Sequence, residues 1–347
     1  MFARKQITIT QVARAAGVST QTVSRVINER PDVAPETRLR VQRVIEQLDY
    51  RPNILARSLI HRRSHTIGVV AMASSFYGPS TTLVGIEKMT RNLGYSLLLD
   101  FMHHPESDDV EHIINRLLSH QVDGILWAVP EIGNNRDWMA RMGTYLPIPV
   151  IYLSMQPMNN VPVVLIDNYL GGRLATEHLL SQGYRNIGVI TGPLDWWESR
   201  QRLGGWRDSL EDAGCPPEVR QIVPGNWSAA SGADGIQMLW QQFPELDAVF
   251  ACNDQIALGA LQAAHRAGRR VPQDLAVAGF DNIPESKYFW PALTTVDQPL
   301  IDLGARAVEA LTRWISAQHR DERTVEAESI LLAPSLVVRD STSAHLS

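Results

Sequence analysis

Four polar side chains near the N-terminus, Thr20, Gln21, Ser24 and Arg25, recur with the spacing of one helix face. Glutamine can pair with adenine, and arginine with guanine, through two hydrogen bonds each at base edges in a major groove. The spacing and the residue types therefore predict base readout by a helix. An ordinary helical hairpin with a polar outer face is the alternative, and the spacing alone leaves it open.

A second group of polar side chains stands at the ends of predicted strands. Arg202 lies just beyond the strand NIGVITG, and Asn253 ends DAVFACN. Asp281 follows LAVAGF, and Gln298 follows TTVD. Open α/β sheets bind ligands at the carboxyl ends of their strands, so we expect these side chains to share a cleft. Taken singly, an aspartate at a strand end more often caps a helix.

Aromatic residues accompany this second group. Trp227 lies in GNWSAASG, and Trp196 and Trp197 lie in PLDWWESR, close to Arg202. Charged and amide groups suit sugar hydroxyls, while an aromatic ring suits the apolar face of a sugar. The combination predicts a sugar site, although a tryptophan is more often a core residue. Tyr77, followed by Gly78 and Pro79, either lines the cleft or belongs to a turn.

The sequence carries no recognisable catalytic signature. It has no GxxxxGK[ST] phosphate loop, no GxSxG elbow, no HExxH and no paired CxxC. The ten histidines are scattered, and the adjacent pair His103 and His104 precedes Pro105 in a predicted loop. We therefore expect a protein that is not an enzyme and that has no catalytic residue, metal site or cofactor.

Two short helices and a tight turn position the N-terminal polar face. Thr8 is a candidate N-cap of the first helix, and Gly17 can end that helix in the left-handed conformation. Val18 fills the space between the helices, and Ser19 is a candidate N-cap of the second. The second helix then presents its N-terminal end to bases, as in a helix-turn-helix.

A third helix is predicted from Pro35, which is favoured at the first helical position, with Glu36 in the first turn. Ala34 precedes it where a serine or threonine would stabilise the helix start by about 1 kcal/mol more. The predicted inner face consists of Leu39, Val41, Val44, Ile45 and Leu48.

From His65 onward, buried-strand patterns alternate with helical ones. The predicted strands are TIGVVAM, YSLLLDF, DGILWAV, PVIYLS, VVLID, NIGVITG, DAVFACN and LAVAGF. The predicted helices are 81–93, 107–120, 170–182, 199–213, 229–242 and 255–267. This alternation predicts an α/β fold of parallel sheets with helices on both faces. The strands are too numerous for one compact sheet.

Length and composition narrow the class further. A chain of 347 residues with 44% apolar residues suits two or three domains with packed cores. No run of about eighteen apolar residues exists, so no membrane span is expected. The start MFARKQITIT lacks the apolar core of a signal peptide. Only Cys215 and Cys252 are present, which favours a reducing, cytoplasmic setting over a disulfide framework.

Charge is divided unevenly along the chain. Residues 1–65 hold twelve Lys and Arg against five Asp and Glu, whereas the remainder holds 20 against 32. The net charge of −5 therefore combines a basic N-terminal module with an acidic body. Such a division fits phosphate contacts confined to one end of the chain.

The stretch TQVARAAGVSTQTVSRVIN, followed by VAPETRLRVQRVIEQLDYRPNILARSL, closely resembles the N-terminus of the lactose-repressor (LacI/GalR) family of bacterial transcription regulators. The resemblance continues to about Asp340 and so covers nearly the whole chain. It implies an all-α helix-turn-helix domain at 1–51, a hinge helix with its linker at 52–65, and a periplasmic-binding-protein-like body at 66–340.

The body, by the same resemblance, consists of two doubly wound parallel-sheet subdomains with a cleft between them. The N-subdomain would comprise about 66–166 and 296–325, and the C-subdomain about 167–294 and 327–340. Residues 341–347 are predicted to be a disordered tail. This tail lacks the leucine heptads that make some relatives tetramers, so a homodimer is expected.

The resemblance also implies which side chains contact DNA. In the family the hinge places a leucine in the minor groove, and ARSL puts that leucine at Leu59. From the residues alone, Leu59 is more simply a linker residue. The predicted DNA-contacting set is Thr8, Ser19, Thr20, Gln21, Thr22, Ser24, Arg25, Asn28, Arg57 and Leu59.

The resemblance further implies a site for a sugar effector in the cleft. The motifs GNWSA and WESRQRLGGW look like those of members that bind glucosides or galactosides, and unlike those of purine-binding members. Where the lactose-type site has an asparagine and an aspartate, this chain has Ala128 and Ser154, which leaves the identity of the sugar open. The predicted effector-binding set is Tyr77, Ser154, Trp196, Arg202, Trp227, Asn253, Asp281 and Gln298.

The sequence as a whole predicts a homodimeric transcriptional regulator, a repressor of carbohydrate-utilisation genes. It would bind near-palindromic, double-stranded operator DNA in the cytoplasm, at the nucleoid, with no membrane partner. A sugar or glycoside in the cleft would control its operator affinity. One alternative is a periplasmic-type sugar-binding protein, which a signal peptide would favour. The other is a sugar-modifying enzyme, which a nucleophile–base pair would favour.

Overall fold

The computed structural model describes residues 7–27, 30–50, 63–72, 76–103, 110–139, 146–320 and 329–343. The chain divides into two compact units, Met1–Ser64 and His65–Ser347. The division falls one residue before the predicted start of the body. Three members of the predicted DNA-contacting set, Asn28, Arg57 and Leu59, lie outside the described residues.

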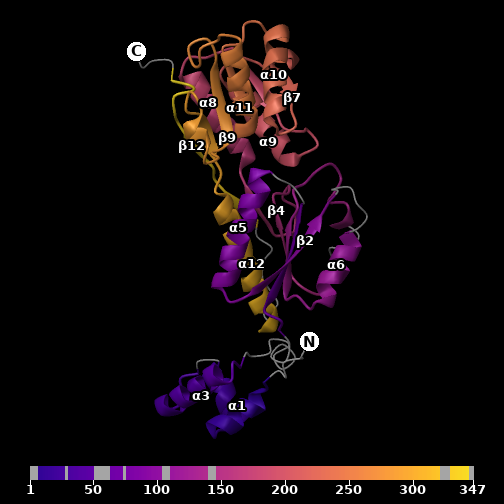
Figure 1. Ribbon diagram of the computed structural model, residues 1–347. Coiled ribbons are helices and arrows are strands. Elements are labelled where there is room, and N and C mark those ends of the chain that lie inside the picture. The colour runs from indigo at the N-terminus through magenta and orange to yellow at the C-terminus, as the bar shows by residue number, and fades with distance from the viewer. Residues whose placement is uncertain are drawn as a thin grey trace, which may run out of the picture. The chain divides into compact units, whose positions relative to one another are not determined.

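The first unit contains the helices α1 (Ile9–Ala16), α2 (Thr20–Ile27) and α3 (Pro35–Gln47) (Figure 1). The predicted local signals are present. Thr8 and Gln11 form a capping box at the start of α1, and Gly17 ends that helix with a φ of 65°. The Ser19 hydroxyl accepts a hydrogen bond from the Thr22 backbone N–H at 3.1 Å. The small core consists of Val12, Ala13, Ala16, Val23, Val26, Val33 and Val41.

The prediction for the inner face of α3 is wrong at one position. Leu39 is 55% exposed, whereas Val41 is fully buried. Residues two apart on a helix differ by about 200° in direction, so Leu39 and Val41 cannot face the same core. Val44, Ile45 and Leu48 pack against that core as predicted.

The body begins with a lobe built on a six-stranded parallel sheet in the order β11-β5-β4-β3-β1-β2. Its strands are β1 (Thr66–Met72), β2 (Ser96–Met102), β3 (Gly124–Ala128), β4 (Val150–Leu153), β5 (Val163–Ile166) and β11 (Ile330–Leu332). Its helices are α5 (Tyr77–Asn92), α6 (Val110–Ser119) and α12 (Leu300–His319). In Figure 1, α5 and α12 run side by side. The two helices pack on one face of the sheet, and one of the two hydrophobic cores of the body lies between them and the sheet.

The second lobe repeats this plan with the sheet order β12-β10-β9-β8-β6-β7. Its strands are β6 (Ile187–Thr191), β7 (Ile222–Pro224), β8 (Ala248–Ala251), β9 (Ala276–Asp281), β10 (Thr294–Asp297) and β12 (Ser335–Val337). Its helices are α8 (Asn168–Ser181), α9 (Trp197–Asp212), α10 (Ala229–Gln242) and α11 (Asp254–Arg266). Only β12 pairs antiparallel with its neighbour among these strands. The predicted doubly wound fold is confirmed.

The chain crosses between the lobes three times: between β5 and α8, between β10 and α12, and between β11 and β12. The predicted subdomain limits are wrong at two of these crossings. Val296 pairs with Phe280 of β9 in the second lobe, and not with the first. Leu331 pairs with Leu165 of β5, so the segment from 327 does not belong wholly to the second lobe. Strands of three or four residues, such as β11 and β10, carry too little pattern to assign a sheet from sequence.

No helix among the residues that the structure describes combines the length and the apolar character needed to cross a membrane.

The prediction of a disordered tail from residue 341 is wrong for the part that the structure describes. Ser341 and Thr342 are fully buried. The Ser341 hydroxyl donates to the Val277 carbonyl at 2.6 Å and accepts from the Thr294 N–H at 2.8 Å. The Thr342 hydroxyl lies 2.8 Å from His178 Nε2. Because these residues are short and polar, nothing in the sequence indicated that they are buried. In the structure, the Ser341 hydroxyl forms hydrogen bonds with backbone groups of β9 and β10.

Replacing Ser341 by alanine should destabilise the body. The substitution leaves a buried carbonyl and a buried N–H without partners, at about 1–3 kcal/mol for each such group. Urea unfolding measures the effect, and Ser343→Ala is the matched control because Ser343 is only half-buried and makes a single 3.3 Å bond. Equal unfolding midpoints for the two variants would contradict a structural role for Ser341.

Candidate functional site

The N-terminal unit presents the predicted base-reading face to solvent. Thr20, Gln21 and Arg25 are exposed on α2, whereas Ser24, the fourth residue of that face, is half-buried. Arg25 lies 3.5 Å from Asp32, and both side chains are more than half exposed. Exposed ion pairs contribute about 0–1 kcal/mol, so a base or a phosphate can replace Asp32 at little cost. This face has the residue types and the accessibility that direct readout requires.

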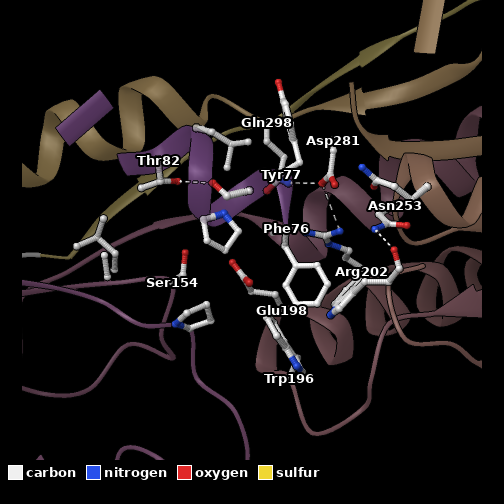
Figure 2. Close-up of a pocket in the computed structure, with 18 of the residues that line it drawn as sticks. Phe76, Tyr77, Thr82, Ser154, Trp196, Glu198, Arg202, Asn253, Asp281 and Gln298 are labelled. Carbon is white, nitrogen blue, oxygen red and sulfur yellow. Dashed lines mark hydrogen bonds and ion pairs between the residues drawn. The ribbon is translucent and has the colours of Figure 1, made fainter. Parts of the chain in front are cut away.

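The body contains a cavity of about 260 Å³ between its lobes. Residues from both lobes line it (Figure 2). All eight predicted effector-binding residues are among them: Tyr77, Ser154, Trp196, Arg202, Trp227, Asn253, Asp281 and Gln298. The fold therefore brings together residues that are spread over more than 200 positions of the sequence. That they bind an effector stays a prediction.

Tyr77, Gly78 and Pro79 line the cavity from the first turn of α5, which begins four residues earlier than predicted. Trp197, in contrast, is buried outside the cavity lining, and its backbone N–H donates to the Glu131 carbonyl at 3.0 Å. The lining residues that the sequence prediction missed include Phe76, Glu198 and Gln255.

Arg202 owes its position to a close approach of α8 and α9. A Cβ on Gly172 would clash with the Arg202 carbonyl, and one on Gly205 would clash with the Tyr169 carbonyl. Only glycine at these two positions lets the helix backbones meet. Arg202 Nε then donates to Asn168 Oδ1 at 2.7 Å. The guanidinium stacks 3.8 Å from the centre of the Phe280 ring, which fixes its plane.

Asp281 is the partner of this arginine at the end of β9. Its carboxylate lies 3.7 Å from Arg202 Nη1 and accepts a hydrogen bond from Gln298 Nε2 at 2.7 Å. Burial raises the pKa of Asp281 to about 6, although Arg202 and Gln298 act in the opposite direction. The alternative role as a helix cap does not apply, because Asp281 is the last residue of a strand and bonds instead to Gln298.

Asn253 combines two roles. Its Oδ1 accepts from the Ile256 N–H at 2.8 Å, so it is the N-cap of α11. Its Nδ2 donates to the Trp227 carbonyl at 3.0 Å. The capping role that an isolated polar residue at a strand end suggests is thus correct here, and the side chain lines the cavity as well.

An aromatic wall closes one side of the cavity. The ring of Trp196 makes edge contacts with Phe76 and Trp227, each at a centroid distance of 5.7 Å. Gly192, after β6, has no room for a Cβ because the Trp227 ring lies against it. The apolar face of a sugar ring can pack against such a wall of aromatic side chains.

Glu198 adds a carboxylate that the sequence prediction did not include. Figure 2 shows it between Ser154 and Arg202, inside the cavity. Burial raises its pKa, while nearby Arg202 and a hydrogen bond from the Ser154 side chain lower it to a lesser extent. A glutamate in a charged helix usually faces water, so only its position four residues before Arg202, on the same helix face, could have indicated this placement.

Asp254 is a further buried acid, but it has a structural role. One oxygen accepts from the Ile283 N–H at 2.8 Å, and the other bonds to the Thr295 hydroxyl. Burial and nearby Asp281 raise its pKa to about 8, against smaller opposing effects from Thr295, Ile283 and Arg339. At neutral pH the folded protein therefore holds a proton here that the unfolded chain releases.

This proton makes stability depend on pH in a defined direction. A carboxyl whose pKa is higher in the folded state stabilises the fold at low pH, and this stabilisation is lost as the pH rises through the folded pKa of about 8. We expect the melting temperature of the parent protein to fall between pH 6 and pH 9. Asp254→Asn keeps an acceptor for Ile283 and a donor for Thr295, so its melting temperature should fall less. Parallel curves for the two proteins would refute the assignment.

These features define a class of protein: a helix-turn-helix unit joined to a two-lobed body with a small-molecule cavity, which is the plan of an effector-controlled transcription regulator. Residues 8–53 match the bacterial regulatory proteins of the lacI family, and residues 176–342 match the periplasmic binding protein-like domain. The chain is 33% identical over 341 residues to catabolite control protein A of Priestia megaterium, covering 97% of this chain and 99% of the relative. It belongs to the lacI family of bacterial regulatory proteins.

Other relatives agree over the full length. The ribose operon repressor of Escherichia coli (strain K12) is 35% identical over 338 residues, covering 96% of this chain and 99% of the relative. Among solved structures, the lac repressor dimer bound to operator and the anti-inducer ONPF matches with a TM-score of 0.83 at 30% identity, covering 97% of this chain and 99% of that chain. The complex of the transcriptional regulator CelR with cellobiose matches with a TM-score of 0.71 at 30% identity, covering 97% and 100%.

Proposed function

We propose that this protein is a homodimeric transcriptional repressor of carbohydrate-utilisation genes, and that a sugar or glycoside in the cavity controls its affinity for operator DNA. The observation that carries the proposal is the composition of the cavity. One fixed ion pair, several amide groups and an aromatic wall converge on one space between two lobes. Binding to operator DNA assigns the protein to the cytoplasm, at the nucleoid.

The relatives support both halves of this proposal. One solved relative is a dimer on operator DNA, and another holds cellobiose. In this chain, Tyr288 and Trp290 are 78% and 93% exposed, and Phe101 on the edge strand β2 is 41% exposed. Large apolar side chains that lie together on a folded surface are typical of an interface, and Tyr288 and Trp290, two residues apart in the chain, support pairing of two copies.

A ligand in the cavity can act on the lobes because the ion pair is bonded to two crossing segments. Arg202 bonds to Asn168, which lies at the first crossing, and Asp281 bonds to Gln298, which lies at the second. A ligand that contacts Arg202, Asp281 and Ser154 touches both lobes and binds their open and closed arrangements with different affinities. Such a difference is what shifts a conformational equilibrium.

On the DNA side, Arg25→Ala should weaken operator binding by about 1–3 kcal/mol and relax preference at one base pair in each half-site, because a bidentate contact to guanine is lost. Selection from a random DNA library by the parent protein defines the operator, and selection by the variant measures the change. The exposed Arg14→Ala on α1 is the matched control. An unchanged preference at every position would exclude base readout by Arg25.

On the effector side, Asp281→Asn should abolish the response to sugar while operator affinity without sugar stays close to that of the parent. An amide retains one acceptor where the carboxylate has two, and it cannot neutralise Arg202. The backbone at residue 281 has a φ of 107°, which asparagine tolerates about as well as aspartate.

Thermal-shift screening of the parent against mono- and disaccharides identifies the sugar, and operator affinity with and without it is then measured for both proteins. A variant that melts much earlier than the parent, yet still responds to sugar, would show that Asp281 serves the fold and not the effector.

A further inference from the structure

One buried acid lies outside the cavity and has no part in the proposed function so far. Glu131 follows β3 in the first lobe, is 3% exposed and is not among the residues that line the cavity. A charged side chain is costly to bury unless it is paired and hydrogen-bonded, so its partners indicate what it does. Its Oε2 accepts from the Gln156 N–H at 2.9 Å and from Arg136 Nη1 at 3.1 Å. Both partners belong to the first lobe, and they fix the carboxylate there.

The backbone at Glu131 takes part in a short antiparallel contact between the lobes. Ile132 of the first lobe pairs with Trp196 of the second. Two hydrogen bonds, of 3.0 and 2.9 Å, flank this pair: Trp197 N–H to the Glu131 carbonyl, and Gly133 N–H to the Asp195 carbonyl. We call residues 131–133 and 195–197 the interlobe bridge. The ring of Trp196 belongs to the aromatic wall of the cavity, so this wall is attached to the bridge.

The side chain of Arg200 supports the second-lobe half of the interlobe bridge. It lies on α9, and its Nη1 donates to the carbonyls of Leu194 and Asp195 at 3.0 and 2.8 Å. Its Nη2 also lies 3.9 Å from Glu131 Oε1. In the first lobe, the Ile132 N–H donates to Asn135 Oδ1 at 3.1 Å. Each half of the bridge is therefore fixed within its own lobe, and the carboxylate of Glu131 contacts both halves.

We propose that Glu131 is a positioning residue of the cavity: through Arg200 and the interlobe bridge it holds the two lobes together, and so places the Trp196 ring in the wall against which a ligand packs. The inference rests on the proposed function, because it concerns affinity for the ligand of the same cavity. Glu131 acts on the ligand only through Trp196, since its own side chain does not line the cavity.

The link between lobe contact and ligand affinity is a population effect. A ligand that packs against the complete wall binds the fraction of molecules in which the bridge is formed. Its apparent affinity falls in proportion to that fraction. Loss of the carboxylate therefore weakens binding without removing any group that touches the ligand.

The first test needs no ligand. Hydrogen–deuterium exchange, read by mass spectrometry on peptides that contain the Trp197 and Gly133 amides, reports how often the interlobe bridge opens. Glu131→Gln keeps an acceptor for a backbone N–H and loses the charge that pairs with the two arginines. We expect both amides to exchange about tenfold faster than in the parent. The Gly225 amide, which is bonded within the second lobe, should keep its rate.

Asp100→Asn is the matched control. Asp100 is also a buried acid of the first lobe, 6% exposed on the edge strand β2, and it accepts from Arg116 Nε of the same lobe at 2.7 Å. Both variants should melt earlier than the parent, because each breaks a buried carboxylate–arginine pair. Only Glu131→Gln should speed exchange at the interlobe bridge, so a general loss of stability cannot produce the expected difference.

The second test measures ligand binding. Titration calorimetry of the full chain with glucose, galactose, cellobiose and lactose identifies a sugar that the parent binds. Glu131→Gln and Arg200→Gln should each bind that sugar about tenfold more weakly. The double variant should bind it no more weakly than the weaker single variant, because both changes break the same link. Asp100→Asn should bind it as the parent does.

Different results reject different statements. If Glu131→Gln leaves exchange at the interlobe bridge unchanged, or if Asp100→Asn speeds it equally, Glu131 does not hold the lobes together. If exchange rises but the sugar affinity stays that of the parent, Glu131 does not position the wall for a ligand. If none of these sugars binds the parent, the proposed function fails, whereas the exchange experiment still decides whether Glu131 joins the lobes.

Discussion

The buried pair of Arg202 and Asp281 is the interaction on which the site depends. Arg202 is 5% exposed and Asp281 7%, so neither charge is solvated and each requires the other. The fold supplies the remaining conditions: glycines that let α8 and α9 meet, an aromatic ring under the guanidinium, and a strand that ends at the carboxylate. Loss of either partner would leave an uncompensated charge inside the body.

The location of this pair also connects the cavity to the joint between the lobes. Asn168 opens the helix after the first crossing, and Gln298 follows the strand before the second. Each is hydrogen-bonded to one member of the pair. On the far side of the cavity, the segment around Glu131 is tied to the second lobe by the Trp197 N–H and by the Asp195 carbonyl. The last two bonds join the two lobes directly, so a change in lobe angle must rearrange them.

The sequence predicted what local rules determine. The caps at Thr8, Ser19 and Gly17, the strand–helix alternation and the residues at strand ends all follow from short-range chemistry and from parallel-sheet topology. The sequence did not predict the positions of residues that are placed by packing between segments far apart in the chain. Ser341 is buried by β9 and β10, Leu331 joins β5 from 166 positions away, and Glu198 faces a cavity from a helix turn that looks solvent-exposed in sequence. The spacing of Glu198 four residues before Arg202 was the one local indication, and no local pattern encodes the contacts of Ser341 and Leu331.

Asn253 both caps α11 and lines the cavity, and these two roles limit how the ligand preference of such a chain can change during evolution. Because this side chain also starts α11, a mutation that alters its contact with a ligand lowers the stability of the whole lobe. Glu198 starts no helix and supports no neighbouring backbone, so substitutions there cost the fold little. A change toward new effectors therefore costs the fold least through the first turn of α9, and Asn253 should be among the last positions in the cavity to vary.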